Sequence, residues 1–135
     1  MASAKAPLSR RAALIVAAVG VVILGLALHY LSLGEPAGLA ADALYTVLVY
    51  LVLAAIAPRA PRHWLALAAF GFSVAVEFSQ LTGIPAQLAE GFPPSRLVFG
   101  TTFSGWDLAA YAVGAAAVWA ADRATSRQWL PSRLE

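Results

Sequence analysis

Cysteine is absent from the 135 residues, and charged residues are scarce. Without a thiol the chain can form no disulfide, no thiolate metal site and no cysteine nucleophile. Only 12% of the residues are charged and 61% are hydrophobic, whereas soluble domains carry about a quarter charged residues. This balance excludes a soluble globular domain and predicts an integral membrane protein.

Motifs for bound cofactors are also missing. No glycine-rich loop precedes a lysine, which excludes a P-loop nucleotide site. The two histidines, His29 and His63, do not have metal-ligand spacing, and no basic patch with interleaved aromatic residues points to nucleic acid. We therefore expect no cofactor, no metal site and no nucleic-acid partner.

Four long apolar stretches are present instead, separated by breaks that are rich in proline and glycine. A helix that crosses a membrane needs roughly 20 residues, because about 30 Å of hydrocarbon has to be crossed. The predicted spans are residues 12–31, 39–57, 64–82 and 104–121. A chain of this length is expected to form one membrane domain, 1–135, folded as an all-α bundle of four transmembrane helices.

Lysine and arginine are distributed unevenly around these spans. Eight of the nine lie before the first span, between the second and third, or after the fourth, and only Arg96 lies elsewhere. Cytoplasmic loops carry the excess of these residues. The pattern predicts a multi-pass protein of the bacterial inner membrane with both termini in the cytoplasm. The basic N-terminus would also fit a signal peptide, but the apolar run that follows is long for one.

Polar residues inside the predicted spans lie at a common depth. Ionisable groups in spans usually face the bundle interior or a water-filled cavity. Glu77 and Gln80 follow Ser73 at helical spacing late in the third span, and Tyr111 follows Asp107 early in the fourth. The sequence therefore predicts a ligand-binding polar pocket open to the outer leaflet, formed by Asp42, Tyr45, Glu77, Gln80, Arg96, Asp107 and Tyr111.

The opposite half of the bundle is expected to be closed. Residues 64–72 and 112–121 consist mainly of alanine, valine, leucine and tryptophan, which predicts an apolar plug on the cytoplasmic side. Residues 83–100 are too short and too rich in proline to span the membrane. We expect a short interfacial helix there, followed by a turn that dips toward the pocket as a re-entrant segment.

Three carboxyl groups face one arginine in the predicted pocket. Arg96 can bridge carboxylates with its two parallel N–H groups, but the acids remain in excess. Either some of Asp42, Glu77 and Asp107 are protonated, or the pocket receives a cationic or hydroxyl-rich ligand.

Structural roles for the same residues remain open. Asp107 ends an S-x-x-D capping box, and Asp42 in a first helical turn suits the positive end of the helix. Glu77 lies in mid-helix, so a structural role requires a buried partner, with Arg96 or Gln80 as the candidates. Arg96 alone would also suit a lipid phosphate.

The segment Glu77-Phe78-Ser79-Gln80, together with Arg96 and the Asp107, Tyr111 and Gly114 series, resembles the E-x-x-Q … R … D-x-x-x-N/Y-x-x-G pattern of VanZ-like membrane proteins. Tyr111 stands where asparagine is usual, and only four spans are predicted. The resemblance implies a role in the cell envelope, since the namesake is associated with resistance to lipoglycopeptide antibiotics.

A closer resemblance is to a related family of small bacterial membrane proteins of unknown function. That family begins its second span with Gly-Leu and then Asp-Ala-Leu-Tyr, which here are residues 38–39 and 42–45. The two resemblances together cover roughly residues 38–114 and imply that the polar residues act as one site.

Three functions fit this pattern. The leading hypothesis is an outward-facing protein that binds a polar or lipid-linked molecule of the cell envelope. An enzyme would use Glu77 or Asp107 as a catalytic acid or base on a lipidic substrate. A homo-oligomeric channel or transporter subunit is the third hypothesis, and the predicted apolar plug is its weakness.

Overall fold

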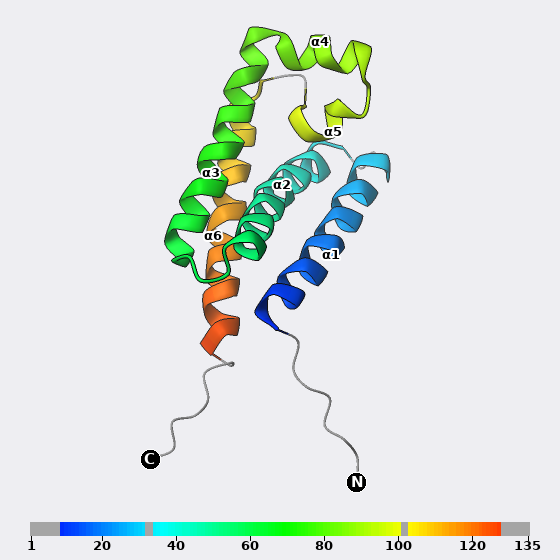
Figure 1. Ribbon diagram of the computed structural model, residues 1–135. Helices are drawn as coiled ribbons and strands as arrows, with labels where there is room; N and C mark the ends of the chain where they lie inside the picture. Colours follow the sequence, from blue (N-terminus) through cyan, green and yellow to red (C-terminus); the bar gives the residue numbers. More distant parts are fainter. Residues whose placement is uncertain (1–8, 32–33, 101–102, 128–135) are drawn as a thin grey trace, which may run out of the picture.

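The computed structural model describes residues 9–31, 34–100 and 103–127, and these residues contain helices and no strand. Four long helices form the bundle, and three short ones connect the third to the last (Figure 1). The long helices are α1 (Arg10–Leu31), α2 (Glu35–Ile56), α3 (Arg62–Ser79) and α6 (Gly105–Arg127). The short ones are η1 (Gln80–Thr82), α4 (Ile84–Gly91) and α5 (Ser95–Phe99). The predicted all-α fold is confirmed.

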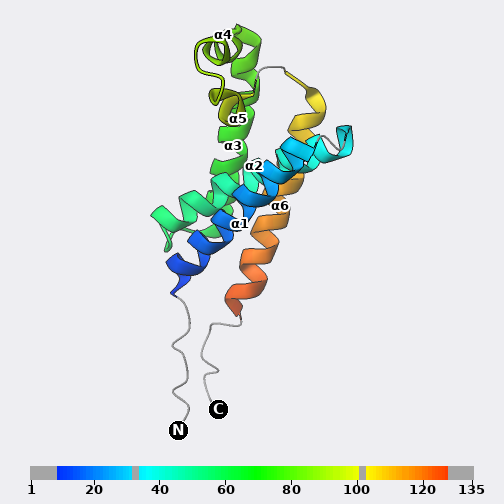
Figure 2. The ribbon, with the colours of Figure 1, turned by 90° about the vertical axis from the view of Figure 1, so that its right-hand side faces the viewer.

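The bundle has two distinct ends. The beginning of α1, the α2–α3 turn and the end of α6 lie together at one end, here called the termini end, while α4 and α5 cover the other, here called the cap end (Figures 1 and 2). Helix α2 lies centrally and packs against α1, α3 and α6, and α3 also packs against α6. Helix α1 therefore stands at the edge of the bundle.

Three helices are long and apolar enough to cross a membrane, namely Arg10–Leu31, Pro36–Ile56 and Arg62–Thr82. By length and composition the chain is thus a membrane protein. Helix α6 has 23 residues but is not among the three candidates in the described part of the chain, because Asp107, Asp122 and Arg123 lower its apolar character. The predicted count of four spans therefore remains a prediction.

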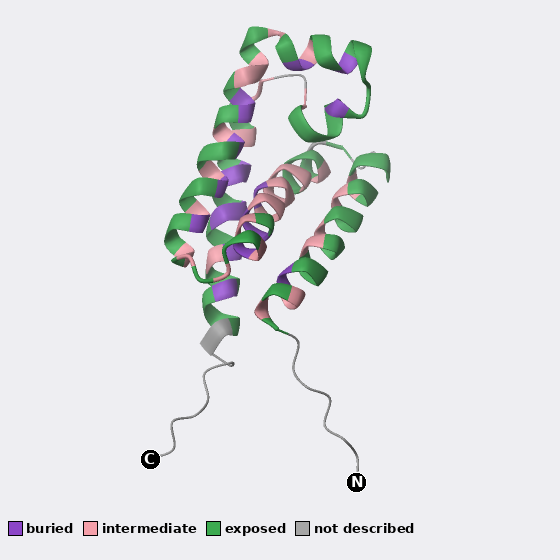
Figure 3. Ribbon diagram, viewed as in Figure 1, coloured by how far each residue is buried: buried purple, intermediate pink, exposed green. Residues whose placement is uncertain are grey.

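Apolar side chains cover the outside of the bundle. On α1, Ile15, Val16, Val19 and Ile23 are each 50–65% exposed, and Figure 3 shows the outer faces of the long helices as exposed. Contiguous apolar surface of this extent is unusual for a protein in water. It suits helices whose outer faces contact lipid.

Glycine and proline set the helix ends at the cap. Gly34 (φ 92°) precedes α2, whose second residue is Pro36, and Gly83 (φ 76°) lies between η1 and α4. Glycine adopts a positive φ without the steric cost of a Cβ atom, so the chain can turn sharply here. The two short helices α4 and α5 occupy the segment for which a short helix and a turn were expected.

The apolar packing predicted for residues 64–72 and 112–121 is found at the termini end, where Leu65 and Val118 from these stretches pack with Leu14 and Leu51. However, among the described residues the four largest side chains with essentially no exposure are Thr46, Tyr50, Ser73 and Glu77. Asp122, one residue beyond the apolar stretch 112–121, is buried as well. Polar side chains are thus buried at several levels of a largely apolar interior.

Candidate binding cavity

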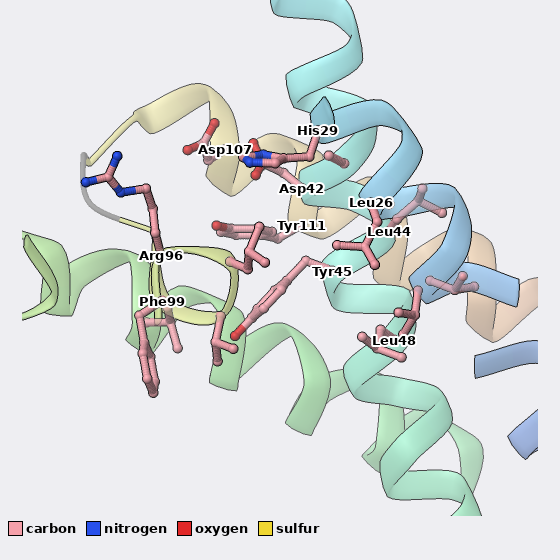
Figure 4. Close-up of a pocket in the computed structure, with 18 of the residues that line it drawn as sticks. Leu26, His29, Asp42, Leu44, Tyr45, Leu48, Arg96, Phe99, Asp107 and Tyr111 are labelled. Carbon is pink, nitrogen blue, oxygen red and sulfur yellow. The ribbon is translucent and has the colours of Figure 1, made fainter. Parts of the chain in front are cut away.

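A partly open cavity of about 510 Å³ lies at the cap end and is lined by residues of α1, α2, α3, η1, α5 and α6 (Figure 4). Apolar side chains of α1, α2 and α5 form one part of its wall, and polar side chains from α1, α2, η1, α5 and α6 form the rest. The apolar part includes Val22, Leu26, Leu44, Leu48, Leu97, Val98 and Phe99. The polar part comprises His29, Asp42, Tyr45, Gln80, Arg96, Asp107 and Tyr111. We call this space the cap-end cavity.

Six of the seven residues that the sequence predicts for the site line the cap-end cavity. The exception is Glu77, which lies behind the wall and has no exposed surface. His29, which was not among the site residues predicted from the sequence, also lines the cavity. Its position near the end of the first span, level with Asp42, was the signal that could have placed it there.

Asp42 and Asp107 bring two carboxyl groups together from different helices. Both side chains are half-buried, and they lie close enough to interact with each other and with Glu77. Their proximity depends on a close crossing of α2 and α6. A Cβ atom on Gly114 would overlap the backbone carbonyl group of Ala43, the residue after Asp42, so only glycine fits at this crossing.

Glu77 organises the wall of the cavity from behind. Its carboxylate accepts a 2.7 Å hydrogen bond from the backbone N–H of Ser104 and another of 2.7 Å from the hydroxyl of Tyr111. It therefore fixes both the entry into α6 and the orientation of Tyr111. The partners suggested by the sequence, Arg96 and Gln80, are not the ones observed.

Tyr45 and Tyr111 form an aromatic pair inside the cavity. Their ring centroids are 6.2 Å apart, and the ring planes are inclined by 49°. Tyr111 is buried and Tyr45 is half-buried. Because the Tyr111 hydroxyl is engaged by Glu77, its ring has a fixed position against which a bound molecule can pack.

Gln80 connects α5 to the end of α3. Its Nε2 donates a 2.7 Å hydrogen bond to the carbonyl oxygen of Phe99. A Cβ atom at Gly100, which has φ 63°, would lie 2.5 Å from that nitrogen. The Gln80 Oε1 atom is buried and accepts no hydrogen bond from any described residue, which leaves an acceptor available beside the cavity.

Arg96 lines the cavity from α5 but is exposed, and it makes no ion pair with a described carboxylate. The predicted bridge between Arg96 and the acids is thus not formed in this structure. The described residues also contain no group of three or more His, Asp or Glu side chains placed to hold a metal ion.

A second polar cluster lies at the termini end, and little in the sequence pointed to it. Asp122 accepts two hydrogen bonds from Arg10, of 2.6 and 2.9 Å, and a third from the hydroxyl of Tyr50. Arg62 completes the cluster at 3.4 Å from the same carboxylate. Four helices contribute one residue each, so the cluster ties the ends of α1, α2, α3 and α6 together.

A third polar contact lies between the two clusters. Thr46 donates a 2.8 Å hydrogen bond to Ser73, and Ser73 donates one of 2.9 Å to the carbonyl oxygen of Ala69 in its own helix. Both side chains are completely buried. The contact joins α2 to α3 near the middle of the bundle.

The fold and the site define a helical membrane protein with a cavity at one end of its bundle that is lined by both polar and apolar side chains. Residues 34–115 match a family described as "Protein of unknown function (DUF2809)". This match covers more than half of the chain, which therefore belongs to the DUF2809 family. The matched region contains all seven predicted site residues and leaves out α1.

Membership in a family of unknown function agrees with the closer of the two resemblances seen in the sequence. The family match gives no link to VanZ-like proteins, so that resemblance remains a prediction. No curated protein and no solved structure matches the chain.

Proposed function

We propose that this chain is a VanZ-like protein of the bacterial inner membrane whose cap-end cavity faces outward and binds an amphipathic molecule of the cell envelope. The ligand is a lipid or a lipid-linked molecule with a hydroxyl-rich or cationic head. In this arrangement both termini lie in the cytoplasm, α6 is a fourth span, and α4 and α5 lie at the outer surface.

The length and charge distribution of α6 support its role as a span. Its 23 residues extend about 34 Å at 1.5 Å per residue, which is enough to cross the hydrocarbon. Residues 108–121 carry no charge. Asp107 and Asp122 lie near its two ends, and each adjoins polar groups of neighbouring helices.

The mixed lining of the cavity is the observation that carries the proposal. Carboxyl oxygens of Asp42 and Asp107 and the free Oε1 of Gln80 offer hydrogen-bond acceptors. Acceptors of this kind need donors, which hydroxyl and ammonium groups supply. Leucine, valine and phenylalanine side chains in the same lining suit a hydrocarbon chain. A lipid can combine a head group that donates hydrogen bonds with a hydrocarbon chain.

The position of α1 supports access from the membrane. Helix α1 packs against α2 at the edge of the bundle and meets α6 through the Arg10–Asp122 ion pair at the termini end. At the cap end the cavity lies between these two helices. A lipid chain can therefore enter sideways between them while its head group meets the acids.

Native mass spectrometry of the full-length protein, released gently from its own membrane, tests the proposal. We expect a lipid or lipid-linked adduct that is lost in Asp42→Asn. Glu90→Gln is the matched control, because Glu90 is an exposed acid on α4 outside the cavity lining, and this variant should retain the adduct. Absence of any adduct from a stable oligomer would support the channel or scaffold hypothesis instead.

An enzymatic function is the second candidate, and the adjoining carboxyl groups of Asp42 and Asp107 favour it. Asp107 lines the cavity whereas Glu77 does not, so Asp107 is the better placed acid or base for a lipidic substrate. If the adduct is a substrate, Asp107→Asn should abolish its turnover while leaving its binding largely intact.

A further inference from the structure

Polar groups occupy the deepest positions of this bundle. Of the described residues, the four largest side chains that are fully buried are Thr46, Tyr50, Ser73 and Glu77. Each ends in a hydroxyl or carboxyl group. Ionisable groups are rare inside membrane proteins, and where they occur they often mark ion pathways and proton relays.

These groups follow the axis of the bundle from one end to the other. On α2, Asp42, Thr46 and Tyr50 repeat every four residues and so share one face of the helix. The buried groups of α3 and α6 turn toward the same interior, as the distribution of burial in Figure 3 shows. We call this set the polar column; it consists of Asp42, Thr46, Tyr50, Ser73, Glu77, Asp107, Tyr111 and Asp122.

Pairs of side chains from different helices form the steps of the polar column. Asp42 adjoins Asp107 at the cavity, and Tyr111 donates to Glu77 behind it. Next along the column, Thr46 donates to Ser73. At the termini end, Tyr50 donates to Asp122. Every step contains at least one group that can both give and receive a proton.

The α2 members of the polar column follow one another at intervals of one helical turn, four residues or about 6 Å of rise. Proton transfer between steps that are not hydrogen-bonded to each other requires a bridging water molecule. The section between Thr46 and the Tyr50 hydroxyl passes through the apolar core, to which Tyr50, Ala69 and Val118 belong.

The termini end of the column is open to polar solvent. The side chains of Arg10 and Arg62, beside Asp122, are 31% and 35% exposed. The buried Nε of Arg62 lies 3.4 Å from Asp122 Oδ2 in the ion pair but donates no hydrogen bond to a described residue. A donor of this kind next to the last carboxylate is suited to hold a water molecule where protons enter or leave.

We infer that the polar column conducts protons between the cap-end cavity and the termini end. Each hydroxyl or carboxyl group receives a proton on one side and releases another on the other side. After one proton has passed, every group carries its original number of protons. The net result is that one proton is taken up at Asp42 and Asp107 and one is released beside Asp122. This activity goes beyond ligand binding in the cavity and does not require the ligand.

Proton flux into liposomes tests the inference. The full-length protein is reconstituted in vesicles that contain the pH dye pyranine, and a potassium gradient with valinomycin sets the membrane potential. We expect flux well above that of protein-free vesicles. Thr46→Val should reduce it about 100-fold, since it removes one proton-transfer group at nearly constant volume. Thr46→Ser, which retains the hydroxyl, should conduct.

Two results would overturn the inference: flux of the unmodified protein no greater than that of empty vesicles, or equal flux of Thr46→Val and the unmodified protein. If Thr46→Val does not fold, Tyr50→Phe decides in the same way, because it keeps the ring and removes only the hydroxyl. Thr46 does not line the cavity, so Thr46→Val should keep the lipid adduct that Asp42→Asn loses. The flux measurement can therefore contradict proton conduction without contradicting lipid binding, and the adduct measurement can do the reverse.

Discussion

The hydroxyl of Tyr111 donates a 2.7 Å hydrogen bond to one oxygen of the Glu77 carboxylate, while the other oxygen accepts the backbone N–H of Ser104 at 2.7 Å. One buried side chain of α3 thus holds a cavity-lining side chain of α6 and the residue that precedes this helix. The arrangement of the cap-end cavity depends on this carboxylate even though Glu77 does not line the cavity.

Replacing Glu77 with glutamine should destabilise the protein. The amide retains one acceptor oxygen, so either Ser104 N–H or the Tyr111 hydroxyl is left buried without its acceptor, at a cost of about 1–3 kcal/mol. Thermal unfolding in detergent measures the effect. Glu90→Gln is the control and should unfold like the unmodified protein. If both variants unfold alike, Glu77 is not the anchor described here.

A double-mutant cycle should show that Glu77 and Tyr111 act as a pair. Tyr111→Phe removes the hydroxyl alone, and its effect should be much smaller in a Glu77→Gln background than in the unmodified protein. Directly bonded residues typically show coupling of about 0.5–3 kcal/mol. Strictly additive effects in the unfolding measurement would mean that the hydrogen bond contributes nothing.

Gly114→Ala should separate α2 from α6. Its Cβ atom would overlap the backbone carbonyl group of Ala43, and backbone cannot give way as a flexible side chain can. We expect a loss of about 1–3 kcal/mol, as for other overpacked positions, together with loss of the lipid adduct, since Asp42 moves away from Asp107.

Gly71→Ala provides the matched control for this substitution. Gly71 lies within α3, and a Cβ atom added there would have no neighbour within 4 Å among the described residues outside its own turn of helix. Alanine is favoured over glycine in helices by about 0.5–1 kcal/mol, so this variant should be as stable as the unmodified protein or slightly more so. A comparable loss in both variants would show that the α2–α6 crossing is not specifically tight.

The outer half of the site could be predicted from the sequence because its residues repeat at helical spacing within apolar stretches. Asp42, Asp107 and Tyr111 stand out against leucine and alanine, and their depth follows from the length of each span. Glu77 was found by the same signal, but its partners were not. A hydrogen bond to Ser104 N–H depends on how the chain enters α6, which no periodicity encodes.

The termini end could not be predicted in the same way. Asp122 follows the predicted fourth span and has arginine as its neighbour, so it resembled an ordinary charged residue in solvent. Its partners Arg10, Tyr50 and Arg62 come from three other helices. Only the packing of these helices brings them together.

The cluster around Asp122 should dominate the stability of the termini end. Asp122→Ala leaves Arg10 and Arg62 without their shared carboxylate. Breaking a buried ion pair in this way lowers the free energy of unfolding by about 3–5 kcal/mol. Because both arginines are partly exposed, we expect a loss at the lower end of this range. Thermal unfolding in detergent measures it. Arg59→Gln, at a cation in the α2–α3 turn outside this cluster, should have little effect.

The absence of cysteine allows the proposed topology to be tested with single introduced thiols. Gln87→Cys on α4, Ala57→Cys in the α2–α3 turn and Thr125→Cys near the end of α6 all replace exposed residues. In intact cells a membrane-impermeant maleimide should label Gln87→Cys alone. Ala57→Cys and Thr125→Cys should react only after permeabilisation, since four spans place both on the cytoplasmic side. Labelling of Thr125→Cys together with Gln87→Cys would instead show that α6 does not cross the membrane. Asp122 of α6 would then not lie at the cytoplasmic side, and the polar column would have no route to the cytoplasm.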